Sequence, residues 1–148
     1  MRRDLLLYNT PPEWNVKVFT QDDFEYYCDR DGIVVKETPL EKPGLYIYRD
    51  GQPQIFLNDE LRGVQRLFIA FHELAHHWLH PSDVQMFHGM IAHGLSAQVE
   101  LEANIVAICC LIPKTILTHY WPSEIVELHG YTHDLVNFRC EVFDQWKI

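Results

Sequence analysis

The sequence predicts an α+β domain in which a small antiparallel β-sheet of about three strands packs on a helical core. Two observations lead to this class. Runs of β-branched and aromatic residues, separated by turn residues, are confined to residues 32–59, as expected for short strands. One short helical segment precedes them, and longer segments with helical periodicity follow. The order of helix, strands and helices is that of an α+β domain.

Length and charge limit the class of protein. The chain has 148 residues and a formal net charge of −9. This length favours one domain, residues 1–148, and the acidic charge argues against direct contact with nucleic acid or anionic membranes. No segment resembles a secretion signal or a membrane span, and the four cysteines show no CxxC spacing. We therefore expect a cytoplasmic protein, whose oligomeric state the sequence leaves open.

The first predicted helix covers residues 21–30. Thr20 is a suitable cap with Asp22 and Asp23 behind it, and Gly32 is expected to stop the helix. Turn residues in the segments TPLEKPG and DGQP then separate three apolar runs. These runs are predicted to form strands at residues 32–37, 44–50 and 52–59.

A long helix is expected to follow the strands. Asn58 or Asp59 is its predicted cap, and it should end near His80 because Pro81 follows. Residues 81–95 show no clear period, which favours a loop or a short helix with loose ends.

The remaining chain is predicted to be helical. Ser96 is a suitable N-cap for a second long helix over residues 97–112, which Pro113 should stop. Two further helices are expected in residues 121–146, with a break at Gly130 and a proline near the start of the first.

The long helix carries a pattern typical of metal binding. His72, Glu73 and His76 form the pattern HExxH. Residues four apart on a helix stand one turn above each other, with Cβ atoms roughly 5–6 Å apart. The two imidazoles can therefore share one zinc ion, Zn²⁺, and Glu73 can reach a water molecule on that metal.

A catalytic zinc site needs a third protein ligand. The metzincin pattern is excluded, because this chain has Leu79 and Ser82 where that pattern has a glycine and a third histidine. Glu100 and Glu102 on the second long helix are the candidates, and they point about 200° apart around the helix. Glu100 shares a face with Ala103, Asn104 and Ala107, and this small-residue face suits close approach to the first helix. We therefore choose Glu100, with Glu102 as the alternative, and expect Asn104 to hydrogen-bond a ligand imidazole.

The sequences of these two predicted helices also resemble those of a known protein family. RLFIAFHELAHHWLH and the later VELEANIVAICCLIP resemble the ImmA/IrrE family of bacterial and phage metallo-endopeptidases, over about residues 44–117. The resemblance implies a zincin-like domain with His72, His76 and Glu100 as zinc ligands and Glu73 as the catalytic acid and base. It also implies that the substrate is a helix-turn-helix repressor encoded nearby. Phe71 departs from the family's pattern, which has alanine there.

Other histidines and tyrosines of the chain are weighed for a part in the site. His77 and His80 are explained by the dipole at the C-terminal end of a helix. The donor that would stabilise the carbonyl oxyanion of the substrate stays open. The candidates are His88, His93, Tyr120, His129, Tyr131 and His133.

Two functional hypotheses therefore compete. The first is a zinc endopeptidase that holds an extended substrate peptide against an exposed strand, at residues 45–49 or 54–58. The second is a metal-binding regulatory module that binds a repressor or a toxin–antitoxin partner without cleaving it. A helix-turn-helix at residues 122–147 is disfavoured, since Arg139 and Lys147 are the only bases expected there.

Overall fold

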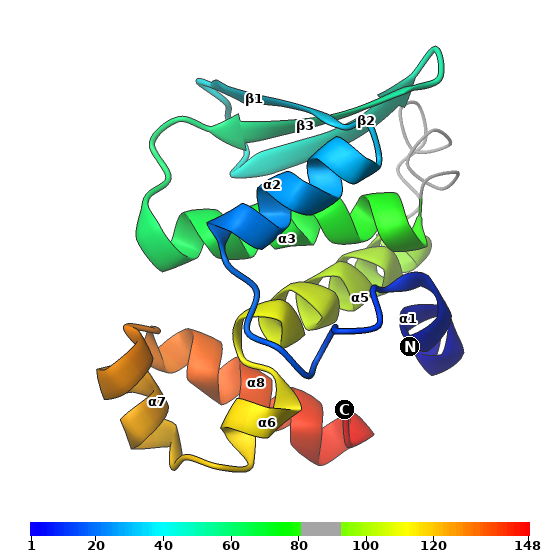
Figure 1. The fold of residues 1–148 in the computed structure, drawn as a ribbon. Coiled ribbons are helices and arrows are strands. Elements are labelled where there is room, and N and C mark those ends of the chain that lie inside the picture. Colours follow the sequence, from blue (N-terminus) through cyan, green and yellow to red (C-terminus); the bar gives the residue numbers. More distant parts are fainter. Residues whose placement is uncertain (81–92) are drawn as a thin grey trace.

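The computed structural model describes the backbone of residues 1–80 and 93–148, and the side chains of residues 1–80 and 97–148. A three-stranded sheet forms one layer, and the helices lie below it in the view of Figure 1. The predicted α+β class is confirmed. In order, the elements are α1 (Arg3–Asn9), α2 (Gln21–Arg30), β1 (Val34–Thr38), β2 (Gly44–Arg49), β3 (Gln52–Asn58), α3 (Gly63–Leu79), α5 (His93–Leu111), α6 (Lys114–Leu117), α7 (Pro122–His129) and α8 (His133–Trp146).

Helix α2 has the predicted bounds and begins at the predicted cap. The Asp23 backbone N–H donates to the Thr20 hydroxyl, and the Thr20 backbone N–H donates to the Asp23 carboxylate at 2.8 Å. This reciprocal pair is a capping box. Lys17 adds an ion pair with Asp23 at 2.7 Å.

This cap has a measurable pH dependence. Burial acts to raise the pKa of Asp23, but the hydrogen bonds from Lys17 and Thr20 outweigh it and hold the pKa below 3.8. The carboxylate therefore stabilises the fold above pH 3.8, and this contribution is lost as the pH falls through the lowered pKa. We expect Asp23→Asn to cost about 0.3–1 kcal/mol in urea unfolding at pH 7. The difference from the unmutated protein should shrink in acid, and a difference that stays constant would contradict this account.

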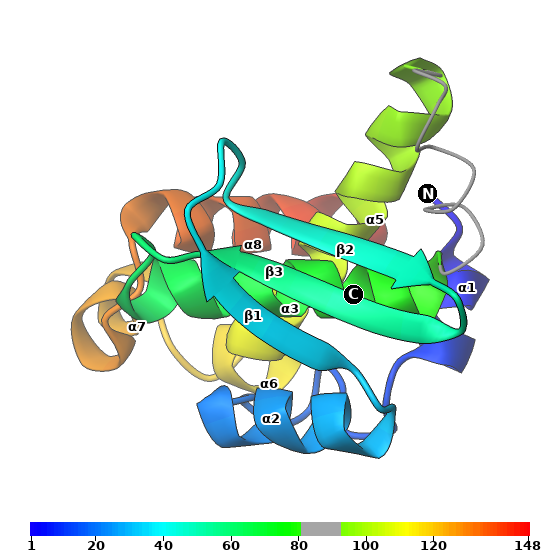
Figure 2. The same cartoon turned by 90° about the horizontal axis from the view of Figure 1, so that it is seen from above.

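The sheet is mixed, which corrects the expectation of an antiparallel one. Strand β2 pairs with β3 in antiparallel register, as predicted, but β1 pairs with β3 in parallel. The strand order is β1-β3-β2 (Figure 2). The reason lies in the connection between β1 and β2, which crosses the end of β3 and does not turn back as a hairpin. Asn58 binds this crossing: its side-chain amide donates to the carbonyls of Leu40 and Lys42.

Two predicted helix starts are wrong. Helix α3 begins at Gly63 with Arg62 at its N-cap, and not at Asn58 or Asp59. The side-chain oxygen of Asn58 accepts from the Glu60 backbone N–H at 3.0 Å, in the turn before α3, while its NH2 group holds the crossing segment. Helix α5 begins at His93, so Ser96 lies inside the helix and is not its N-cap. Of the predicted loop at residues 81–95, residues 81–92 lie outside the described part of the chain, and the rest is helical.

The core lies between the sheet, α3 and α5. Phe71, which departs from the family's pattern, is fully buried. Its ring centroid lies 5.7 Å from that of Phe19 and 5.8 Å from that of Phe24. The larger side chain at this position therefore fills space between α3 and α2. The difference from the family's alanine at this position therefore affects the packing of the core.

Helices α7 and α8 are the two C-terminal helices that were predicted. Gly130 separates them and has a left-handed conformation, with φ 68°. Helix α6 was not predicted. Arg139 on α8 is fully buried and donates from Nε to the carbonyl of Ile112 at 2.6 Å. Arg139, one of the two bases of the disfavoured helix-turn-helix, is therefore part of the core and is not exposed for DNA contact. Among the helices that the structure describes, none is long and apolar enough to cross a membrane.

Candidate metal centre

Helix α3 buries the three residues of the HExxH pattern. His72 is 8% exposed, Glu73 6% and His76 5%. The Nε2 atoms of the two imidazoles lie 3.2 Å apart, so both rings face one point. One potential ligand atom from each of the three residues lies within 4.8 Å of the others.

Helix α5 brings Glu100 to the same point. Its two carboxylate oxygens lie 3.2 Å from Nε2 of His72 and 3.2 Å from Nε2 of His76. Glu73 Oε1 is farther from His72 Nε2, at 4.0 Å. The structure thus places Glu100, and not Glu102, against both imidazoles. The Glu100 side chain is 53% exposed, so the site is open to solvent on that side.

Small residues allow this close approach of the two helices. Ala103 and Ala107, on the predicted small-residue face of α5, are fully buried. The same face carries Asn104, whose Oδ1 lies 2.8 Å from Nδ1 of His72. The predicted hydrogen bond between Asn104 and an imidazole is therefore present.

Charges in the site favour a cation. Burial lowers the pKa of the His72 imidazole, but the hydrogen bond to Glu100 and the charge of Glu73 outweigh burial, so the pKa is raised. The hydrogen bonds from His72 and His76 hold the pKa of Glu100 well below its usual range. Burial raises the pKa of Glu73 although both imidazoles oppose this. Positive charge is therefore stabilised at the point where these groups meet.

The arrangement fits a bound metal ion. Two nitrogens that share a tetrahedral zinc, each at about 2.0–2.1 Å, lie roughly 3.3 Å apart, and the two Nε2 atoms lie 3.2 Å apart. The other nitrogen of each ring has its own neighbour, Asn104 for His72 and His80 for His76. With its proton on Nδ1, each ring would turn the Nε2 lone pair toward a metal, and Glu100 would complete a donor set of two imidazoles and a carboxylate.

Gly44 is a further part of the site that sequence reasoning missed. A Cβ atom on this residue would lie 2.8 Å from Glu73 Oε1 and 2.8 Å from Ile69 Cγ2. The start of β2 therefore touches the Glu73 carboxylate directly. A glycine at the first position of a predicted strand was the only sequence signal, and it had an ordinary explanation as a turn residue.

His77 near the end of α3 and His80 at its C-cap point in different directions. Nδ1 of His77 lies 2.8 Å from the Tyr46 hydroxyl, and its Nε2 lies 3.4 Å from Asp31. His77 therefore faces the sheet and α2. His80 is buried beside His76, and its Nε2 lies 2.8 Å from Glu102.

Among the candidate oxyanion donors, those of the C-terminal region lie apart from the histidines of α3. Tyr131 donates its hydroxyl proton to the carbonyl of Leu111 at 2.6 Å. The rings of Tyr120 and His129 contact each other, and His133 begins α8. His88 and the side chain of His93 lie outside the described residues. The oxyanion donor is therefore unassigned.

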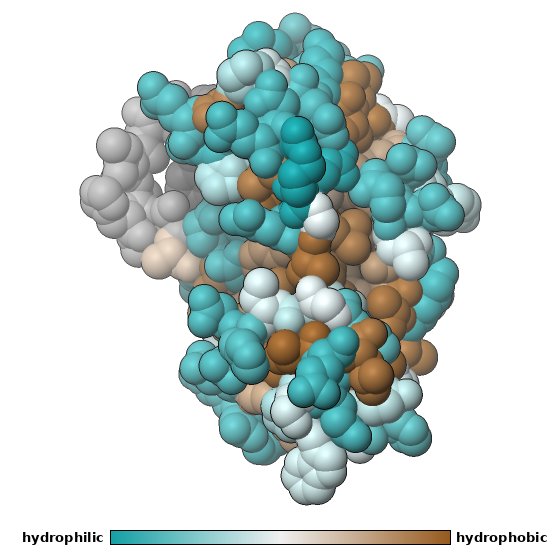
Figure 3. All heavy atoms as spheres, turned by 90° about the vertical axis from the view of Figure 1, so that its left-hand side faces the viewer, coloured by the Kyte–Doolittle hydropathy of each residue, from teal (hydrophilic) through white to brown (hydrophobic). Residues whose placement is uncertain are grey.

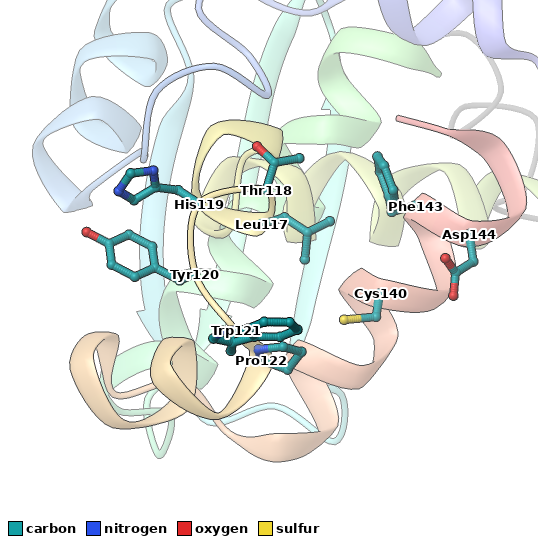
Figure 4. A pocket seen from close by; sticks show the side chains of 9 residues that line it. All are labelled: Leu117, Thr118, His119, Tyr120, Trp121, Pro122, Cys140, Phe143 and Asp144. Carbon is teal, nitrogen blue, oxygen red and sulfur yellow. The ribbon is translucent and has the colours of Figure 1, made fainter.

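A hollow lies away from the HExxH residues, among the C-terminal helices. It has a volume of about 600 Å³. Figure 4 shows Leu117 to Pro122 on one side of it and Cys140, Phe143 and Asp144 of α8 on the other. Apolar side chains are also frequent on the face in Figure 3, below the sheet and over these helices. Trp121 at this hollow is 76% exposed.

Comparison with known proteins finds a family match that spans this site. The family model Peptidase M78, described as the IrrE N-terminal-like domain, matches residues 28–135. This region includes the HExxH residues and Glu100. The chain is also 31% identical, over 101 residues, to an uncharacterised immunity region protein 2 of Bacillus phage phi105. The alignment covers 65% of this chain and 64% of the phage protein, slightly less than two thirds of that relative.

Proposed function

The chain belongs to the Peptidase M78 family of IrrE N-terminal-like domains, and from this premise we propose that it is a zinc-dependent endopeptidase. At family level the match supports a metallopeptidase. In our proposal His72, His76 and Glu100 hold the zinc ion, and Glu73 is the catalytic residue.

One observation carries this proposal: Glu100 places an oxygen against Nε2 of each imidazole, with Glu73 beside them. Held by His72, His76 and Glu100, a zinc ion would supply Lewis acidity toward the scissile carbonyl and a bound water molecule. Glu73 Oε1 accepts a proton from the attacking water and passes it to the leaving amine. Its burial supports this role, because the raised pKa brings the carboxylate closer to the proton affinity that a general base needs.

The substrate peptide is proposed to lie along the outer edge of β2. Of the two strands considered, β3 pairs on both sides within the described residues, whereas β2 is an edge strand. Figure 2 shows this edge on the side of α5, which carries Glu100. An extended peptide added there would pass the Glu73 carboxylate, because Gly44 begins β2 next to it.

The proposed substrate is a helix-turn-helix repressor encoded beside the gene. The support is the family resemblance, together with a relative whose name places it in a phage immunity region. The test is to incubate the zinc-loaded protein with that repressor and to identify fragments by mass spectrometry. Defined fragments support the peptidase, whereas a stable complex with an intact repressor would favour the non-proteolytic regulatory module.

Gly44 offers a test of how Glu73 is positioned. The added methyl group of Gly44→Ala would displace the Glu73 carboxylate, and a displacement of about 1 Å can cost roughly 100-fold in rate. We expect kcat/KM for repressor cleavage to fall about 10–100-fold, with zinc affinity unchanged.

The matched control is Gly32→Ala. Gly32 has a φ of 67° and no neighbour within 4 Å of an added Cβ, so alanine there strains the backbone and lowers stability without touching the site. Its kcat/KM should stay unchanged. Equal losses in both variants would show that Gly44 acts through general stability and not through Glu73.

A further inference from the structure

A buried polar cluster lies on the far side of His76 from Glu100. Its centre is Glu102, whose side chain is fully buried. Arg2 donates to this carboxylate from its backbone N–H at 2.9 Å, from Nε at 3.2 Å and from Nη2 at 2.9 Å. Gln98 donates at 3.2 Å, and His80 Nε2 lies at 2.8 Å. Five donor atoms thus surround one carboxylate.

The cluster reaches the proposed metal centre through His80. Its Nδ1 lies 3.4 Å from Nδ1 of His76, while its Nε2 faces Glu102. The ring centroids of His76 and His80 are 5.6 Å apart. His80 therefore stands between a proposed zinc ligand and a buried carboxylate, with one ring nitrogen toward each.

The donor and acceptor of each hydrogen bond are set by the two ends of the chain, His76 at the metal centre and the Glu102 carboxylate. His76 turns Nε2 toward Glu100, so a neutral ligand imidazole carries its proton on Nδ1. That proton is donated to Nδ1 of His80, which must therefore be the acceptor. A neutral His80 then carries its own proton on Nε2 and donates it to Glu102, which as a carboxylate only accepts.

We propose that His80 and Glu102 are positioning residues, which fix the tautomer and orientation of His76 for metal binding, and that Arg2 anchors them to the N-terminal segment. This inference rests on the proposed zinc centre. Arg2 precedes the region that matches the family, residues 28–135. The positioning chain thus extends from the family domain to a residue outside the matched region.

The competing explanation is a buried ion pair that only packs the helices. An Arg2–Glu102 pair would satisfy that role by itself, since the guanidinium already binds both carboxylate oxygens. It does not explain why His80 directs its second nitrogen at a proposed ligand. If His80 and Glu102 only stabilised the packing, their substitution would lower stability but would leave the zinc affinity of the folded protein unchanged.

The test measures zinc affinity by competition with a chromophoric chelator. His80→Phe keeps a ring and removes both nitrogens, and we expect zinc to bind about 10–100-fold more weakly. Glu102→Gln keeps the shape and removes the charge, and we expect a loss of roughly tenfold or more. His77→Phe is the matched control on the same helix, because His77 faces Tyr46 and Asp31; its zinc affinity should not change.

A second readout is independent of zinc affinity and of folding of the variants. Nitrogen-15 NMR of the unmutated zinc-loaded protein should show His80 protonated at Nε2 and unprotonated at Nδ1. The opposite tautomer, or unchanged zinc affinity in a folded His80→Phe variant, would overturn the inference alone. If the unmutated protein takes up no zinc, the proposed zinc centre is overturned, and the inference with it.

Discussion

Glu73→Gln is expected to lower cleavage of the repressor by about 10²–10⁴-fold, the usual contribution of general acid–base catalysis, while zinc affinity stays unchanged. Glutamine has the same shape but cannot accept the proton of the attacking water. Zinc should remain, because Glu73 Oε1 is 4.0 Å from His72 Nε2 while Glu100 oxygens are 3.2 Å from both imidazoles. Initial rates of fragment formation and the zinc content per chain provide the measurement.

Glu60→Gln is the matched control for this prediction. Glu60 is exposed and lies in the turn before α3, so the same change of charge there should leave cleavage unaltered. Retained cleavage in Glu73→Gln would remove Glu73 from the mechanism. Loss of zinc in that variant would make Glu73 a ligand.

Glu100→Ala is expected to weaken zinc binding by more than about 100-fold. Loss of a residue that only orients a ligand costs up to about 100-fold in metal affinity, and loss of a ligand itself should cost more. The reason is that, among residues 1–80 and 97–148, Glu100 is the one that faces Nε2 of both imidazoles with a carboxylate oxygen at 3.2 Å. Its side chain is 53% exposed, so the substitution opens no cavity in the core. Chelator competition measures the affinity.

Thermal unfolding gives a second measurement for Glu100→Ala. Zinc at a concentration about 1,000 times its Kd stabilises a folded protein by about 4 kcal/mol, and the variant should lose most of this gain. The metal-free variant should be slightly less stable than the metal-free unmutated protein, because the hydrogen bonds from His72 and His76 to Glu100 are lost, so the gain from zinc is measured against each protein's own metal-free value. Glu127→Ala, at an exposed position of α7, should behave as the unmutated protein. Unchanged zinc affinity in Glu100→Ala would show that the third ligand lies elsewhere.

The local features of the fold were predictable from sequence because neighbours along the chain decide them. Thr20 and Asp23 form their capping box within one turn, so the start of α2 was predicted correctly. The break at Gly130 is equally local. Asn58 shows the limit of this reasoning, since it has the chemistry of a cap. Its oxygen accepts from the Glu60 N–H in a turn and not in the helix, and its NH2 group donates to carbonyls 16 and 18 residues away in sequence.

The strand pairing was misjudged for a similar reason. β-Branched runs and turn residues indicate strands and hairpins, and β2 and β3 do form a hairpin pair. These sequence patterns do not indicate which edge of the β2–β3 pair binds β1. The crossing of residues 39–43 over the end of β3 decides it, and a parallel pair results.

At the site, helical periodicity favoured Glu100 over Glu102 because the small faces of Ala103 and Ala107 indicated which side of α5 meets α3. The same periodicity could not explain Glu102, whose partners Arg2 and His80 come from other parts of the chain. His80 was accordingly interpreted through the helix dipole. Its hydrogen-bond partners depend on how the N-terminal segment, α3 and α5 pack together.

The sequence by itself determined the α+β class, the helix that carries His72, Glu73 and His76, and the face of α5 that carries Glu100, since spacing along a helix dictates which side chains share a face. Tertiary structure alone decided the mixed sheet, the contact of Gly44 with Glu73 and the chain from His76 through His80 to Glu102 and Arg2. These depend on how closely separate elements approach, which is set by packing of the whole core and not by any local pattern.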